Sequence, residues 1–208
     1  MPKPSVTNAV FVNAPFEKLS GSKRGVTFEQ IGRDVYSLYH QQVMHDCPIK
    51  YEKTRNTKCD WMHPTIDKEL RVECKSSRMY YHVKQQKWLF SFNNVKRDHF
   101  DVCVLVAYFP NRLEVWLWNG KGYSTSGVKT ATQGGSIVVS GRKGKDWDEF
   151  DSPHQVIGEL FFDDMNGEPV EVQLKTVKIK TTSSTRNVKA LVSVELKNMW
   201  LRAGVKHV

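Results

Sequence analysis

The distribution of apolar residues predicts a long amphipathic helix in the first quarter of the chain. Apolar side chains recur every three or four positions at Phe28, Ile31, Val35 and Leu38. This spacing places them on one face of a helix that we expect to run from Thr27 to about Met44. Thr27 and Gln30 fit a capping box at its start, and the opposite face carries Glu29. Residues 1–26 are expected to form an irregular arm.

A change to alternating apolar and polar residues predicts a β-hairpin over residues 59–76. A turn at 64–68 divides this segment into two strands. In the second strand, apolar residues alternate with polar ones in the order Leu70, Arg71, Val72, Glu73, Cys74, Lys75. Because successive side chains of a strand point to opposite faces, we expect Glu73 and Lys75 to share one face.

Three further elements are predicted after this hairpin. Residues 80–92 have apolar positions at helix-compatible spacing, so we expect a helix that crosses over to the next strand. Residues 101–108 predict a central strand, because 102–106 are apolar at every position, as in strands covered on both faces. Residues 114–118 alternate in character and predict a strand nearer the edge of the sheet.

The composition changes in the last part of the chain. Glycines are interleaved with lysines and arginines, without an acidic residue, from Gly120 to Lys145. Residues 119–155 are therefore predicted to be a flexible basic loop region that becomes ordered on DNA. Residues 156–208 contain two alternating segments and predict a β-rich extension. We expect a single α/β domain over 1–208, with a mixed central sheet flanked by helices and a catalytic core at 27–118.

The charge of the chain favours a polyanionic partner. The 208 residues include 31 Lys and Arg against 22 Asp and Glu, which gives a net charge of +9. A basic surface that serves only solubility is the alternative. Neither a secretion signal nor an apolar run near the roughly 20 residues of a membrane helix is found. We therefore expect no membrane partner and an intracellular protein, cytoplasmic or, in a eukaryote, nuclear.

Two acids and a lysine are expected to meet at one cleft of the predicted hairpin. Asp60 lies in the first strand, and Glu73 and Lys75 share a face of the second. Carboxylate oxygens are hard ligands for one or two Mg²⁺ ions, which keep open positions for water and phosphate oxygens. Lys75 would orient or help deprotonate the attacking water and offset charge in the transition state. Glu29 would complete the metal site.

Each of these residues also has a purely structural interpretation. Glu73 and Lys75 can form an ordinary exposed ion pair, which contributes little to stability. Glu29 lies at a helix start, where the dipole and the cap favour an acid. Asp67 is the rival aspartate for Asp60, but its position favours a role in the hairpin turn.

The order of these motifs resembles that of the PD-(D/E)xK nuclease superfamily, in which a helix with an inward glutamate precedes Asp, Glu-x-Lys on a strand, a helix and an apolar strand. The match covers about residues 22–118. Residues 23–29 together with 72–76 are similar to archaeal Holliday-junction resolvases. Residues 71–75, with Phe100-Asp101 opening a later strand, are similar to intron-encoded homing endonucleases, and many restriction enzymes share this core. One departure is Cys59, which stands where the family usually has a proline.

The resemblance implies a Mg²⁺-dependent DNA endonuclease of restriction or homing type, in which Mn²⁺ can substitute. Asp60, Glu73 and Lys75 take the family's catalytic positions, and Glu29 is the helix acid, so Asp60, Glu73 and Glu29 are the implied metal ligands. A structure-specific resolvase is one alternative, and a nucleic-acid-binding protein without catalysis or an RNA endonuclease is another. A homodimer is expected because cutting both strands of a duplex needs two active sites.

Two other groups of residues were considered for binding. The residues predicted to contact DNA are Lys84, Lys87, Lys129, Arg142, Lys143 and Lys145. For Lys84 and Lys87, with the glutamines between them, the alternative is the polar face of a helix. Zinc is the rival metal, with His45, Cys47, Cys59 and His63 as ligands, but their spacing does not form the usual zinc knuckle.

Overall fold

The computed structural model describes residues 5–12, 14–43, 58–65, 67–128, 130 and 133–162. The helical elements are α1 (Val6–Val10), α2 (Gly21–Val43) and the 3-10 turns η1 (Pro15–Lys18) and η2 (Arg97–His99). The strands are β1 (Trp61–Pro64), β2 (Glu69–Arg78), β3 (Tyr80–His82), β4 (Lys87–Val95), β5 (Val102–Tyr108), β6 (Arg112–Leu117), β7 (Tyr123–Ser124), β8 (Gly135–Ser140) and β9 (Gln155–Phe161).

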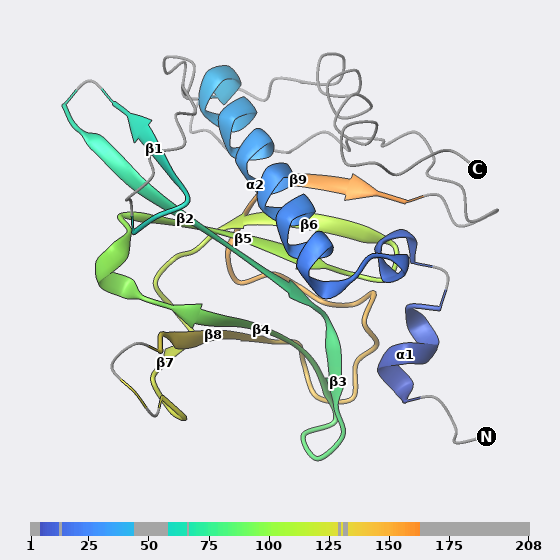
Figure 1. The fold of residues 1–208 in the computed structure, drawn as a ribbon. Helices are drawn as coiled ribbons and strands as arrows, with labels where there is room; N and C mark the ends of the chain where they lie inside the picture. The colour runs from blue at the N-terminus through green and yellow to red at the C-terminus, as the bar shows by residue number, and fades with distance from the viewer. Residues whose placement is uncertain are drawn as a thin grey trace, which may run out of the picture.

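These strands form two sheets (Figure 1). A five-stranded sheet has the order β1-β2-β5-β6-β9, and a four-stranded antiparallel sheet has the order β3-β4-β8-β7. In the larger sheet, β2 pairs with β5 in parallel and every other neighbouring pair is antiparallel. The predicted α/β class, the mixed central sheet and the β1–β2 hairpin are therefore confirmed.

The strand β5 lies at the centre of the larger sheet, as its apolar run predicted. It pairs with β2 on one side and β6 on the other, and its residues from Cys103 to Tyr108 are buried. The strand predicted at 114–118 is β6, which lies nearer the edge than β5, as expected, with β9 as the edge strand beside it. That neighbour comes from residues about 40 positions later in the sequence, which local alternation cannot reveal.

Helix α2 covers one face of the larger sheet, where it contacts β2, β5, β6 and β9 (Figure 1). The other face packs against the smaller sheet through aromatic residues, since Trp116 of β6 contacts Phe90 of β4 at a centroid separation of 5.3 Å. Among the described residues, the prediction of helices on both sides of the sheet is thus only half right. A second sheet takes the place of the second helical layer.

The start of α2 was predicted six residues too late. The helix begins at Gly21, where the Ser20 carbonyl accepts from Arg24 N at 2.9 Å and the Ser20 hydroxyl accepts from Lys23 N at 3.4 Å. Ser20 therefore serves as the N-terminal cap that the sequence analysis assigned to Thr27. The Thr27 hydroxyl instead donates to the Lys23 carbonyl within the helix.

The predicted irregular arm is also wrong, because residues 5–12 and 14–19 contain α1 and η1 and pack against the core. Phe16 is fully buried and contacts the ring of Phe28 on α2 at 4.9 Å and that of Tyr108 on β5 at 5.6 Å. The Tyr108 hydroxyl accepts a hydrogen bond from the backbone nitrogen of Phe16 at 3.3 Å. Phe16 stands outside the periodic pattern that begins at Phe28, so sequence patterning missed this packing.

The helix predicted over residues 80–92 is a β-hairpin formed by β3 and β4. Trp88, Leu89, Phe90 and Phe92 of β4 are all buried, as in a strand that is covered on both faces over part of its length. The turn between the strands places Gln86 at a φ of 50°. Tertiary burial of the side chains of β4 thus outweighs the helix-compatible spacing of Tyr81, Lys84, Trp88 and Phe92.

The predicted flexible loop at 119–155 contains β7 and β8, and part of it is core. Ile137 and Val139 of β8 are buried, and β8 pairs with β4. The described part of this segment therefore contributes a strand to the core. The predicted extension at 156–208 begins with β9, which belongs to the larger sheet. The two alternating segments predicted after residue 162 lie outside the described residues.

No helix in the described part of the chain is long and apolar enough to cross a membrane.

Candidate active site

Asp60 is held beside β2 by two backbone hydrogen bonds. The residue immediately precedes β1, whose Trp61 is the register partner of Val72. The backbone nitrogen of Asp60 donates to the Val72 carbonyl at 3.0 Å, and its Oδ2 accepts from the backbone nitrogen of Cys74 at 2.7 Å. The hairpin register therefore fixes the Asp60 carboxylate next to the Glu-x-Lys triplet, as the sequence analysis expected.

Glu73 and Lys75 point to the same face of β2 and form an ion pair. Lys75 Nζ donates to Glu73 Oε1, and only 12% of the Glu73 side chain and 21% of the Lys75 side chain are exposed. A fully exposed ion pair was the structural alternative considered for these residues. The pair is instead largely withdrawn from solvent, where its charges interact more strongly.

Burial and a neighbouring acid shift the titration of Glu73. Burial raises the pKa of its carboxyl, the hydrogen bond from Lys75 lowers it, and the negative charge of Asp60 raises it again. The net result is a Glu73 pKa above its ordinary value. Two carboxylates are thus close enough to repel each other, which is the electrostatic arrangement that a bound cation relieves.

Lys75 remains a cation in this environment. Burial on its own would lower the pKa of the ammonium group, but the hydrogen bond to Glu73 and the charges of Glu73 and Asp60 outweigh it. The Lys75 pKa therefore lies above its ordinary value. Of the two roles expected from the sequence, this favours charge neutralisation over removal of a proton from water.

Glu29 lies on the other side of the larger sheet. It is exposed on α2, one turn before Gly32, where an added Cβ would come within 2.8 Å of Cys74 Sγ. Its charge contributes to raising the Cys74 pKa, after burial and Asp60. Since Cys74 and Glu73 are adjacent in β2, their side chains point to opposite faces. The role of Glu29 as a third ligand stays a prediction.

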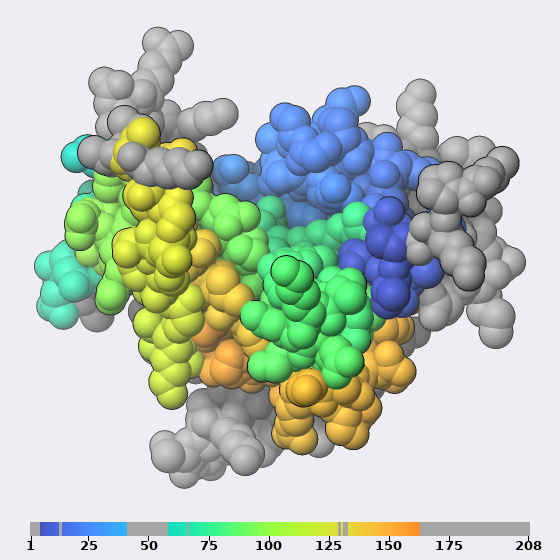
Figure 2. All heavy atoms as spheres, turned by 90° about the horizontal axis from the view of Figure 1, so that it is seen from below, coloured from blue at the N-terminus to red at the C-terminus, as the bar shows by residue number. Residues whose placement is uncertain are grey.

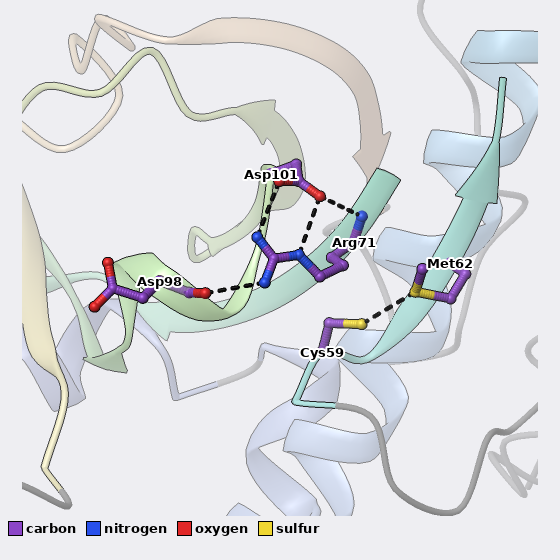
Figure 3. Close-up of polar contacts among 5 residues, drawn as sticks. All are labelled: Cys59, Met62, Arg71, Asp98 and Asp101. Carbon is purple, nitrogen blue, oxygen red and sulfur yellow. Dashed lines mark hydrogen bonds and ion pairs between the residues drawn. The ribbon is translucent and has the colours of Figure 1, made fainter. Parts of the chain in front are cut away.

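The candidate site offers two carboxylates for a metal. Within the described ranges, no group of three or more His, Cys, Asp and Glu side chains is placed to hold a metal ion. Of the rival zinc ligands, His45 and Cys47 lie outside those ranges. The Cys59 thiol donates to Met62 Sδ at 3.5 Å (Figure 3), and His63 Nδ1 is 2.8 Å from the Tyr36 hydroxyl.

A clamp between Arg71 and Asp101 joins β2 to the start of β5 (Figure 3). Arg71 Nε and Nη2 donate to the two oxygens of Asp101 at 3.1 and 3.0 Å, and the Arg71 backbone nitrogen donates to Oδ2 at 2.8 Å. A further bond runs from Arg71 Nη1 to the carbonyl of Asp98 at 3.0 Å. The hydrogen bonds that Arg71 donates to the Asp101 carboxylate lower the pKa of Asp101 to about 2. No local pattern assigns Arg71 a role, because its partner is 30 residues away.

Two further residues, His99 and Cys103, lie near the acids without any local sequence signal. His99 of η2 is close enough for its charge to lower the pKa of Glu73. Cys103 is the register partner of Glu73 on β5, and burial followed by the Glu73 charge raises the pKa of its thiol. Neither residue belongs to a local motif, so only the parallel β2–β5 pairing brings them to the site.

The residues predicted to contact DNA are spread over the structure. Lys84 is exposed in the β3–β4 turn and Lys87 begins β4, so the polar helix face that was their alternative does not exist. Figure 2 shows this hairpin in green and the segment around β7 in yellow on one face of the molecule.

Two of the predicted DNA contacts in the former loop region already have acidic partners. Arg142 Nη2 is 3.1 Å from Asp151, and Lys145 Nζ is 2.7 Å from Glu149. Lys143 is exposed, and Lys129 lies outside the described residues. The acidic partners follow the basic segment in sequence, beyond the window in which the sequence analysis saw only positive charge.

Comparisons of this chain with protein-family models, with curated proteins and with solved structures found no match.

Proposed function

We propose that this protein is a Mg²⁺-dependent DNA endonuclease that hydrolyses phosphodiester bonds at the site formed by Asp60, Glu73 and Lys75. The single observation that carries the proposal is the hydrogen bond from Cys74 N to Asp60 Oδ2 at 2.7 Å. It fixes one carboxylate beside a second, and beside a lysine that the second carboxylate pairs with. This is the combination of groups that metal-assisted phosphodiester hydrolysis requires.

The donor set suits a hard divalent cation. Asp60 and Glu73 would hold it through carboxylate oxygens, and Mg²⁺ usually takes only one or two protein carboxylates and keeps several water molecules. Because burial and the Asp60 charge raise the Glu73 pKa, a cation would compete with a proton for this carboxylate as the pH falls. When bound, the ion would supply Lewis-acid polarisation of the phosphate and a more acidic water.

The side chains of the site supply positioning and charge. Lys75 keeps its proton on Nζ and holds Glu73 Oε1, which orients that carboxylate toward the site. The same ammonium group would offset the negative charge that develops on the phosphate in the transition state. Asp60 is already oriented by the backbone of β2, so little rearrangement is needed when substrate binds.

The net charge of +9 supports a nucleic-acid substrate, because contacts between lysine or arginine and phosphates supply most of non-specific affinity. A sequence-specific cutter that acts as a homodimer is our first candidate. A junction-specific nuclease would cut a different set of DNA substrates. A binding protein without catalysis would bind these substrates and cut none of them.

Incubation of supercoiled plasmid with the protein, with and without Mg²⁺, tests the proposal directly. We expect nicked or linear DNA only with Mg²⁺, and none from Glu73→Gln. Asp67→Asn is the matched control, because Asp67 lies in the exposed β1–β2 turn and its loss should leave cleavage unchanged. Mg²⁺-dependent cleavage of neither plasmid DNA carrying a library of random inserts nor four-way junctions would overturn the proposal. Cleavage of four-way junctions in preference to linear duplex would favour the resolvase alternative.

A further inference from the structure

A pocket of about 430 Å³ opens next to the candidate active site, at the start of β5 and the end of β6. Its lining includes Arg97, Phe100, Cys103, Trp118, Asn119 and Gln155. The volume is in the range of pockets that hold small organic groups. No residue of the proposed catalytic set lines it, so it is a separate feature of the molecule.

The pocket and the candidate site share one row of the larger sheet. Cys103 in the pocket wall is the register partner of Glu73, and the backbone nitrogen of Trp118 donates to the Cys103 carbonyl at 3.0 Å. Glu73 and Trp118 are therefore about two strand spacings apart, roughly 10 Å. A single extended substrate can reach both residues at once.

Arg97 and Trp118 line this pocket, and the ring of Tyr123 lies beside them. The guanidinium carbon of Arg97 lies 5.4 Å from the centroid of Trp118 and 5.6 Å from that of Tyr123. Trp118 is held in place, since its Nε1 donates to the Lys121 carbonyl at 2.7 Å and its ring contacts Phe100. Trp118 and Tyr123 are only half-buried, and Arg97 is exposed.

The local charge suits a phosphate-bearing ligand. Asp101 also lines the pocket, but both of its carboxylate oxygens are already engaged by Arg71. Its negative charge is therefore neutralised by a neighbouring cation rather than presented to a ligand. Arg97 remains as an exposed guanidinium above two aromatic faces, which is a combination that stacks bases and pairs phosphates in single-strand binding sites.

We propose that the Arg97–Trp118 pocket binds an unpaired nucleobase of a DNA strand, stacked on Trp118, next to the phosphate that is cut. This inference rests on the proposed function and specifies its substrate: DNA that is single-stranded or locally unpaired at the cutting site. A paired base keeps its faces covered by its neighbours in the duplex and cannot fill the pocket.

Equilibrium binding tests this without relying on cleavage. Fluorescence anisotropy in EDTA compares a labelled short oligothymidylate with a duplex of equal length. We expect Trp118→Leu to weaken single-strand binding about tenfold, the effect of losing a stacked base. Duplex binding should change by less than about twofold. Trp118→Phe retains an aromatic face and should keep most of the affinity.

The arginine gives a second, independent readout. Arg97→Ala should weaken single-strand binding, and Arg97→Lys should restore the salt dependence but not the full affinity, because lysine keeps the charge and loses the planar group. Lys18→Ala, an exposed lysine outside the pocket, is the control for loss of one charge. Since Arg97 is exposed, its variants should fold even where Trp118→Leu does not.

The two proposals fail in different ways. Equal weakening of single-strand and duplex binding by the pocket variants, or no weakening of either, would overturn the assignment of the pocket even if wild-type protein cleaves plasmid. Loss of the nuclease proposal would instead appear as absent Mg²⁺-dependent cleavage by the wild type, whatever the oligonucleotide titrations give.

Discussion

Arg71 donates three hydrogen bonds to the Asp101 carboxylate across the start of the parallel β2–β5 pair, two from its guanidinium and one from its backbone nitrogen. The backbone nitrogen of Asp101 in turn donates to the Arg71 carbonyl at 2.8 Å. The clamp lies two residues before Glu73 on one strand and two before Cys103 on the other. It therefore sets the register that brings Cys103 beside the acids.

This clamp predicts a specific loss of stability in acid. The folded Asp101 pKa of about 2 is below the value near 3.9 of an unfolded chain. The stabilisation is therefore fully present above about pH 4 and is lost as the pH falls toward 2. We expect Asp101→Asn to flatten this part of the pH profile of the urea midpoint. Asp67→Asn, which alters an exposed turn, should leave the profile as in the wild type, and identical profiles for all three proteins would contradict the assignment.

The close approach of α2 to the larger sheet predicts opposite effects of two glycine substitutions. A Cβ at Gly32 would come within 2.8 Å of Cys74 Sγ and 2.9 Å of Val106 Cγ2, whereas none at Gly25 would meet another atom within 4 Å. Gly32→Ala should lower the free energy of unfolding by about 1–3 kcal/mol through overpacking. Gly25→Ala should raise it by up to about 1 kcal/mol, because alanine is the better helix former. Denaturant unfolding of both variants measures the difference.

Removing Lys75 should make metal binding more sensitive to acid. The hydrogen bond from Lys75 lowers the pKa of Glu73 against burial and the Asp60 charge, so its loss leaves that pKa higher still. A carboxylate must be deprotonated to bind a cation. We expect Lys75→Met to shift the pH dependence of Mn²⁺ affinity to higher pH, as measured by calorimetric titration. Lys68→Met, in the β1–β2 turn, provides the comparison. Superimposable curves for the two variants would show that Lys75 does not influence cation binding through Glu73.

Glu29 is expected to contribute less than the strand acids. It lies over the Cys74 face of β2, whereas Glu73 points to the other face. Glu29→Gln should therefore slow single-turnover cleavage by at most a few-fold, and Asp60→Asn should abolish it. Asp60→Asn keeps an oxygen that can accept from Cys74 N, so the variant should stay folded and bind DNA. A Glu29→Gln rate as low as that of Asp60→Asn would show that the helix acid is a ligand.

The sequence alone could predict features that depend on local pattern. Alternation in residues 69–75 identified the strand carrying Glu73 and Lys75, and the turn after Pro64 placed Asp60 opposite them. Features that depend on distant partners could not be predicted in this way. The aromatic residues of β4 are buried by β8 and β6, and β9 completes the sheet beside β6. Likewise, the pocket near Trp118 exists only because residues from three separate segments meet there.

The packing of α2 against β9 has a consequence for how the chain is made. Val35 of α2 contacts the position of Gly158 in β9, so a helix near the amino terminus is covered by one of the last described strands. During synthesis, α2 leaves the ribosome long before β5, β6 and β9 are available to cover its apolar face. The sheet must also close over large sequence separations, which slows folding. The nascent chain is therefore exposed to misassociation until Gln155–Phe161 has emerged and been added as the edge strand.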